Sequence, residues 1–116
     1  MCYVLVTPAK NEELYIQKTL DSVVAQEIRP RRWVIVSDGS TDRTDMIVSS
    51  YAKQHAFIRL VRRESGTHDF RNKVQAFEAG CKELEGVSYE FIGNLDADIE
   101  LPPDYYSQLL QRFAGD

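Results

Sequence analysis

The chain has 116 residues, 43% of them hydrophobic and 28% charged, which is the balance of a soluble globular protein with one modest core. The net charge of −4 gives no electrostatic reason to expect nucleic-acid binding. No apolar run approaches transmembrane length, and the two cysteines lie far apart without a Cys/His cluster, which argues against a zinc site.

The first predicted strand is Tyr3–Thr7, a β-rich run that Pro8 stops. Its continuous apolarity is typical of a central strand covered on both faces. Asn11 is the expected N-cap of the helix that follows. Apolar residues at helical spacing predict the buried face of that helix, formed by Ile16, Leu20, Val23 and Val24.

The second predicted strand, Trp33–Val36, ends in the turn-forming stretch Ser37–Asp42. Ser40 or Thr41 is expected to cap the next helix, which has acidic residues in its first turn. The third predicted strand, Phe57–Val61, is short and is expected near an edge of the sheet.

A polar loop is expected over Arg62–Asp69, and a long helix over about Phe70–Leu84, which Gly86 breaks. Apolar residues at helical spacing predict the buried face of this helix, formed by Val74, Phe77, Cys81 and Leu84.

The last predicted strand begins at Phe91 and ends at Asp96, and Pro102 and Pro103 stand where a final helix tolerates proline. The elements therefore alternate as β-α-β-α-β-α-β-α. This order predicts an α/β fold, a three-layer sandwich with a mostly parallel sheet, helices on both faces and right-handed crossovers.

Three polar turns follow strands one, two and four of this sheet: Pro8–Glu12, Asp38–Ser40 and Asp96–Asp98. Because the carboxyl ends of parallel strands share one edge, we expect the turns to meet in one crevice. Asp96 and Asp98 can converge on a hard divalent cation, which takes oxygen ligands. An isolated Asp-x-Asp is more often a solvated acidic turn, so the convergence of three turns is what favours a site.

Asp38 can accept hydrogen bonds from a nucleobase edge or a ribose, and Gly39 beside it permits close backbone approach. An Asx-turn that simply ends the strand explains Asp38 equally well. Lys73 begins a helix and could reach a phosphate as a point charge, although a solvated lysine is the simpler interpretation when it is taken singly.

The chain resembles the nucleotide-binding half of family 2 glycosyltransferases of the GT-A fold. The matching stretches are Val6–Glu13, Val34–Asp42 and Asn94–Asp98, and Lys73 and Gly80 fit the helix between them. The resemblance covers nearly the whole chain. The order and spacing of its motifs make it far more specific than a single Asp-x-Asp.

The resemblance implies a metal-dependent, inverting transfer from a nucleotide-diphosphate sugar donor to the hydroxyl of an unknown acceptor, a saccharide, a lipid or a protein. The donor-binding residues that it implies are Pro8, Ala9, Asn11, Glu12, Asp38, Gly39, Ser40, Lys73, Asp96, Ala97 and Asp98. Asp98 and Asp96 would hold Mg²⁺ or Mn²⁺. No nucleic-acid partner is expected.

The chain also departs from the family. Ser37 stands where an additional Asp is frequent, and Glu78 stands where an Asn is common before Gly80. The catalytic base is expected beyond Asp116, so residues 1–116 are expected to form a single domain truncated before the acceptor-binding part. A non-catalytic nucleotide-binding or interaction module is therefore the alternative to an enzyme.

Other enzyme classes fit less well. Haloacid-dehalogenase-like phosphatases carry their Asp-x-Asp on the first strand, with Thr or Val where this chain has Glu100. Nucleotidyltransferases usually open with a Gly-rich loop, whereas this chain has Thr7–Asn11. The sequence also lacks the P-loop, Rossmann and nucleophile-elbow motifs.

The expected location is the cytoplasm. Met1–Ala9 is too short for a signal peptide and lacks its basic lead. Cys2 and Cys81 suit a reducing compartment, because they form no disulfide framework. In a longer protein, the same features are compatible with the cytosolic face of a membrane.

Overall fold

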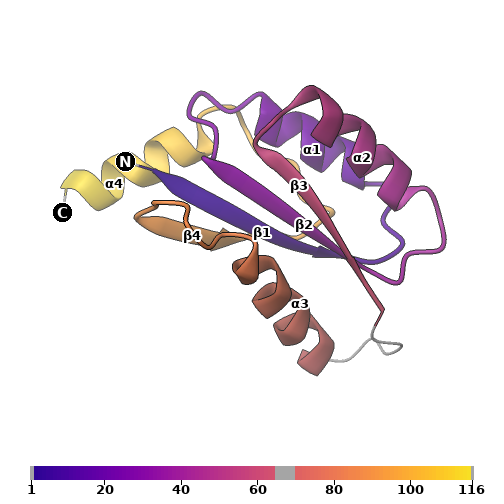
Figure 1. The fold of residues 1–116 in the computed structure, drawn as a ribbon. Coiled ribbons are helices and arrows are strands. Elements are labelled where there is room, and N and C mark those ends of the chain that lie inside the picture. Colours follow the sequence, from indigo (N-terminus) through magenta and orange to yellow (C-terminus); the bar gives the residue numbers. More distant parts are fainter. Residues whose placement is uncertain (1, 65–69, 116) are drawn as a thin grey trace.

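The computed structural model describes residues 2–64 and 70–115, which form one parallel four-stranded sheet in the order β3-β2-β1-β4 (Figure 1). The strands are β1 Tyr3–Ala9, β2 Arg32–Asp38, β3 Ile58–Arg63 and β4 Phe91–Asn94. The helices are α1 Ile16–Val24, α2 Thr44–Gln54, α3 Phe70–Lys82 and α4 Tyr105–Gly115. Part of the loop predicted at 62–69 lies outside the described residues.

The two central strands supply most of the core. β1 pairs with β2 on one side and with β4 on the other. In this register, Val6 is paired with Val34 of β2 and with Asn94 of β4. Val4, Leu5 and Val6 have no exposed surface. The prediction of a central strand covered on both faces is therefore confirmed, as is the edge position of β3.

Helices cover both faces of the sheet, which confirms the three-layer α/β fold. One face packs Leu5, Trp33 and Ile35 against α1, α2 and α4. The other face packs the four valines of β1 and β2 against Ala76 and Leu84, which belong to α3 and the turn after it. Figure 1 shows α1 and α2 on one side of the sheet and α3 on the other.

Both predicted helix caps were wrong. α1 begins at Ile16, and Asn11 instead adopts a left-handed conformation with φ +53°. The Oδ1 atom of Asn11 accepts a hydrogen bond from the backbone N–H of Thr41, 2.8 Å away, so it serves the next turn of the chain and not its own helix.

α2 begins at Thr44, later than a cap at Ser40 or Thr41 would place it. The N-cap position is Arg43, and Asp42 before it forms a local turn in which its Oδ1 accepts hydrogen bonds from both the backbone N–H and the hydroxyl of Thr44, at 2.9 and 2.6 Å.

The buried face of α3 differs from the predicted one. Val74 is 40% exposed, whereas Ala76 is 1% exposed and packs on the sheet. The residue that sets this contact is Gly80, one turn further along. At this point α3 lies so close to the sheet that a Cβ atom on Gly80 would stand 2.5 Å from the Val6 Cγ1 atom.

Among the described residues, no helix has the length and apolarity needed to cross a membrane.

We predict that Gly80→Ala lowers the free energy of unfolding by about 1–3 kcal/mol, because the added methyl overpacks the α3–sheet contact. The better helix propensity of alanine offsets only about 1 kcal/mol of such a cost. Urea denaturation measures the change. The control is Gly115→Ala, where an added Cβ meets nothing within 4 Å. Equal stability of the Gly80 variant and the parent would contradict this packing.

Candidate functional site

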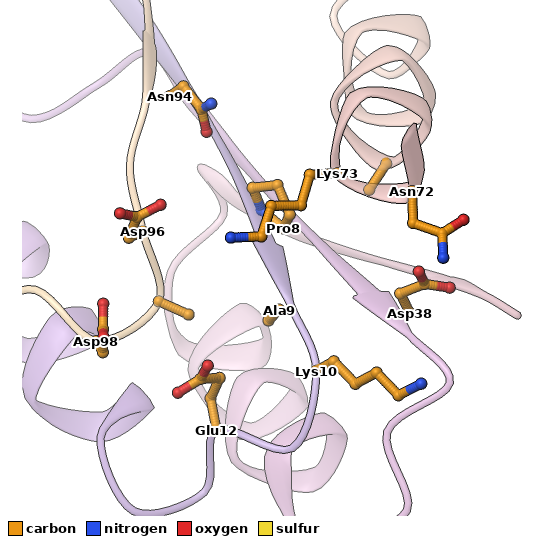
Figure 2. A pocket seen from close by; sticks show the side chains of 12 residues that line it. Pro8, Ala9, Lys10, Glu12, Asp38, Asn72, Lys73, Asn94, Asp96 and Asp98 are labelled. Carbon is orange, nitrogen blue, oxygen red and sulfur yellow. The ribbon is translucent and has the colours of Figure 1, made fainter. Parts of the chain in front are cut away.

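A cavity of about 300 Å³ opens at the carboxyl ends of β1, β2 and β4 (Figure 2). The three predicted turns meet there, and the first turns of α3 close one side. The residues that line it are Pro8, Ala9, Lys10, Glu12, Asp38, Asn72, Lys73, Ala76, Asn94, Asp96, Ala97 and Asp98. A parallel sheet produces this gathering, because its strands all end at the same edge.

Of the predicted binding residues, the structure brings eight together around this cavity: Pro8, Ala9, Glu12, Asp38, Lys73, Asp96, Ala97 and Asp98. The other three do not line it. Gly39, with φ +71°, and Ser40 border a smaller hollow beside Arg62 and Arg63. Asn11 faces the β2–α2 turn. The assignment of these three residues to donor binding stays a prediction.

Hydrogen bonds join the loop after β1 to the β2–α2 turn, and we call this set the loop brace. The backbone N–H of Asn11 donates to Ser40 Oγ at 3.1 Å, and that of Glu12 donates to Thr44 Oγ1 at 2.8 Å. The N–H of Glu13 donates to Asp42 Oδ2 at 3.2 Å. These bonds hold the backbone of residues 11–13 while the Glu12 side chain lines the cavity.

Hydrogen bonds to α1 and β1 hold the turn that carries Asp96 and Asp98. The Thr19 hydroxyl of α1 donates a buried hydrogen bond to the Ala97 carbonyl at 3.0 Å. The Leu95 N–H donates to the Val6 carbonyl at 3.1 Å, which extends the β1–β4 ladder past the strand end. Ala97 is buried between Asp96 and Asp98, whose side chains remain exposed. The anchor therefore presents both carboxylates to solvent and to the cavity.

Negative charge accumulates on this side of the cavity. Burial raises the pKa of Glu12 above its ordinary value, and the carboxylates of Asp98, Asp42 and Asp96 raise it further, while Lys73 opposes the shift. Figure 2 shows Glu12, Asp96 and Asp98 on the same side of the cavity, with the ammonium of Lys73 directed toward that side. A cation or a positively charged partner would relieve this repulsion.

Within residues 2–64 and 70–115, no three His, Cys, Asp or Glu side chains are grouped as a ready metal site. This arrangement still fits Mg²⁺ or Mn²⁺ bound together with a substrate. Mg²⁺ usually takes one or two protein carboxylates and fills its remaining positions with water and substrate phosphates. Asp96 and Asp98 offer that number of hard oxygen ligands.

Sequence reasoning missed four lining residues: Lys10, Asn72, Ala76 and Asn94. Signals for three of them were present. Asn72 and Ala76 are one helical turn apart and flank Lys73 on α3, so they share a face. Asn94 precedes Asp96 by two residues and ends β4. Lys10 lies inside one of the three predicted turns, but nothing in the local sequence shows which side chains of that turn face inward.

Comparisons with known proteins agree with this fold. The profile of the family described as Glycosyl transferase family 2 matches residues 4–116. The poly-beta-1,6-N-acetyl-D-glucosamine synthase of Staphylococcus epidermidis is 33% identical over 103 residues, covering 89% of this chain and 23% of that protein. Its name describes the product of that protein and not of this chain.

Two solved structures superpose over almost the whole chain. A mannosyltransferase of Pyrobaculum calidifontis, in complex with GDP-Man and Mn²⁺, is 27% identical with a TM-score of 0.74, over 97% of this chain and 32% of that chain. Staphylococcus aureus TarS, residues 1–349 in complex with UDP-GlcNAc, has a TM-score of 0.78 over 99% of this chain and 32% of that chain. At 22% identity, TarS shows the fold alone. The 116 residues thus span about a third or less of the length of these proteins.

We predict that Glu12→Gln makes the chain more stable at pH 7. A raised pKa in the folded state means that folding favours the protonated carboxyl, so that contribution is present in acid and is lost as the pH rises through the folded pKa. Glutamine cannot ionise, so the variant lacks the charged carboxylate that destabilises the folded state above the folded pKa of Glu12. Its advantage should shrink as the pH falls below the ordinary glutamate value of 4.5.

Thermal unfolding between pH 3.5 and pH 8 measures this difference between variant and parent. Glu85→Gln, at an exposed glutamate after α3, is the matched control. A pH-independent difference for Glu12→Gln would mean that the gathered carboxylates do not set the stability of this loop.

Proposed function

Because the chain belongs to glycosyl transferase family 2, we propose that its cavity binds the nucleotide-diphosphate sugar donor of a glycosyl transfer. One observation carries the proposal: a single cavity has a buried carboxylate, Asp38, at one end and the exposed pair Asp96 and Asp98 at the other, with Lys73 between them (Figure 2). A nucleoside diphosphate has the same order of chemistry, an uncharged base and ribose at one end and anionic phosphates at the other.

Each part of the donor then has a partner. Asp38, 7% exposed at the end of β2, accepts hydrogen bonds from the nucleoside. Lys73, exposed on the first turn of α3, neutralises phosphate charge. Pro8 and Ala9 form the wall of the cavity at the end of β1, beside the space that the donor would fill.

The metal belongs to the phosphate end. Asp98 would hold Mg²⁺ or Mn²⁺, and Asp96 in the same turn would lie toward the ribose. When bound, the cation acts as a Lewis acid that stabilises the departing nucleoside diphosphate. The Pyrobaculum calidifontis mannosyltransferase was solved in complex with both GDP-Man and Mn²⁺, which supports this assignment.

The reaction is a single displacement with inversion. An acceptor hydroxyl attacks the anomeric carbon, a new C–O bond forms, and the bond to the diphosphate oxygen breaks. The hydroxyl proton passes to a carboxylate base. We place that base outside the 116 residues, where the resemblance to family 2 glycosyltransferases implies it. The acceptor is a saccharide, a lipid or a protein.

It follows that these 116 residues bind the donor but do not transfer the sugar by themselves. The chain spans 23% of the Staphylococcus epidermidis relative, which leaves ample length for a base and an acceptor site in a protein of that size. Rapid transfer by the isolated chain would show that the base lies within it. Donor binding without transfer is the expected result.

The first test is calorimetric titration of the chain with UDP and GDP, each with and without Mn²⁺. We predict that at least one of them binds and that Mn²⁺ strengthens the binding. In Asp98→Ala the Mn²⁺ effect should vanish, so that affinities with and without the metal agree within about a factor of two. Asp98 contributes ligand oxygens that alanine lacks.

Glu100→Ala is the matched control for this variant. It removes the same charge from an exposed carboxylate two residues further along that does not line the cavity. If Glu100→Ala abolishes the Mn²⁺ effect as fully as Asp98→Ala does, the metal is not held where we place it. If neither nucleotide binds under any condition, the proposed function is wrong.

Asp38→Ala should weaken binding of UDP or GDP by roughly 10–100-fold, equally with and without Mn²⁺, because a hydrogen bond to a charged group contributes about 1.5–3 kcal/mol. The same loss is expected for the nucleoside without phosphates, since the contact is made to the nucleoside. Thermal unfolding first establishes that the variant is folded. Unchanged affinity for the nucleoside would remove Asp38 from the binding site.

A further inference from the structure

Helix α1 and the turn after it bury two polar side chains whose partners lie far away in the sequence. Thr19 has no exposed surface, and Gln26 is 4% exposed. A polar group in the interior costs free energy unless it is hydrogen-bonded, so both need a partner. Both find one in the segment after β4, 76–80 residues further along. That segment begins with residues 95–98, which we call the aspartate turn because they include Asp96 and Asp98.

The two side chains hold different parts of this segment. The Thr19 hydroxyl donates a buried hydrogen bond to the Ala97 carbonyl at 3.0 Å, inside the aspartate turn. The Gln26 carboxamide donates from Nε2 to the Pro102 carbonyl at 2.7 Å, and its Oε1 accepts from the Tyr106 N–H at 3.1 Å. Tyr106 lies in the first turn of α4. Gln26 therefore holds the start of α4, whereas Thr19 holds the aspartate turn.

Buried and exposed side chains alternate along the aspartate turn. Leu95 and Ala97 are 7% and 4% exposed, whereas Asp96 and Asp98 are exposed. The hydrogen bond from the Leu95 N–H to β1 secures the first residue of the turn. The Thr19 bond secures its middle, at the residue between the two carboxylates. Without the hydroxyl, the buried Ala97 carbonyl would lose this partner, and the turn would gain freedom to move.

The placement of these two carboxylates matters to a divalent cation. Mg²⁺ requires near-octahedral geometry with ligands at about 2.0–2.1 Å. If the backbone that carries the carboxylates is not already fixed, part of the binding free energy is lost in ordering it. In metal sites generally, removing a hydrogen bond that supports the ligands lowers metal affinity by about 10–100-fold.

We infer that Thr19 is a positioning residue for the metal: its hydroxyl holds the Ala97 carbonyl and thereby sets Asp96 and Asp98 for a divalent cation before that cation arrives. This role rests on the proposed function, which supplies the cation. Thr19 does not line the cavity, so its effect passes through the backbone of the aspartate turn.

Calorimetric titration of the 116-residue chain with Mn²⁺, in the presence of UDP and separately of GDP, measures this role. Thr19→Val keeps the shape of the side chain and removes the hydroxyl, so Mn²⁺ affinity should fall at least about tenfold. Nucleotide affinity without metal should agree with that of the parent within about a factor of two, because the nucleoside end is untouched. Thr19→Ser retains the hydroxyl and should keep Mn²⁺ affinity within about threefold of the parent.

Gln26→Leu is the matched control for a general loss of stability. It removes buried hydrogen bonds to the same segment but leaves the Thr19 bond in place. We expect this variant to unfold at a lower temperature and still to bind Mn²⁺ within about a factor of two of the parent. Thermal unfolding establishes that each variant is folded during the titration. If Thr19→Val is not, Thr19→Ala, which also lacks the hydroxyl, takes its place.

The outcomes separate a failure of this role from a failure of donor binding. Parental Mn²⁺ affinity in Thr19→Val overturns the inference and leaves the proposed function standing. An equal loss in Gln26→Leu, or in Thr19→Ser, also overturns it, because the effect then comes from stability or packing and not from the hydroxyl. If the parent binds neither nucleotide under any condition, the proposed function is wrong and the inference with it.

Discussion

The loop brace is the interaction on which the rest of the site depends. It consists of hydrogen bonds from the backbone of residues 11–13 to side chains of the β2–α2 turn, and of the return contact from Asn11 Oδ1 to the Thr41 N–H. The parallel sheet brings the ends of β1 and β2 to the same edge, but it does not fix the conformation of the loops beyond those ends. The brace does, and it thereby fixes the loop from which Lys10 and Glu12 line the cavity.

A cavity of this kind costs the fold some stability. Partial burial raises the pKa of Glu12, and repulsion from the carboxylates of Asp98, Asp42 and Asp96 raises it further. The chain tolerates this cost because hydrogen bonds to other segments hold the backbone next to these carboxylates in place. The Ala97 carbonyl is bound by Thr19, and the Glu12 N–H is bound by Thr44. The repulsion is thus available to be relieved by a bound cation, a feature common at functional sites.

The fold could be predicted from the sequence because its main determinants are local. Continuous apolar runs at Tyr3–Thr7 and Trp33–Val36 indicate buried parallel strands whatever the rest of the chain does. The errors occurred where a side chain has a distant partner. Asn11 is a good cap by composition, yet its oxygen binds Thr41, 30 residues away. Val74 has helical spacing, but the close approach at Gly80 rotates the buried face of α3 away from it.

The same limit explains the site. The strand-end rule located the turns, but not which of their side chains face the cavity, since that depends on backbone conformation. The left-handed φ of Asn11 turns this residue toward the β2–α2 turn, whereas Lys10 and Glu12 on either side of it line the cavity. The bonds of the brace come from residues 11–13 and not from the Lys10 side chain. A change at position 10 would therefore alter the lining of the cavity while leaving the hydrogen bonds of the brace intact.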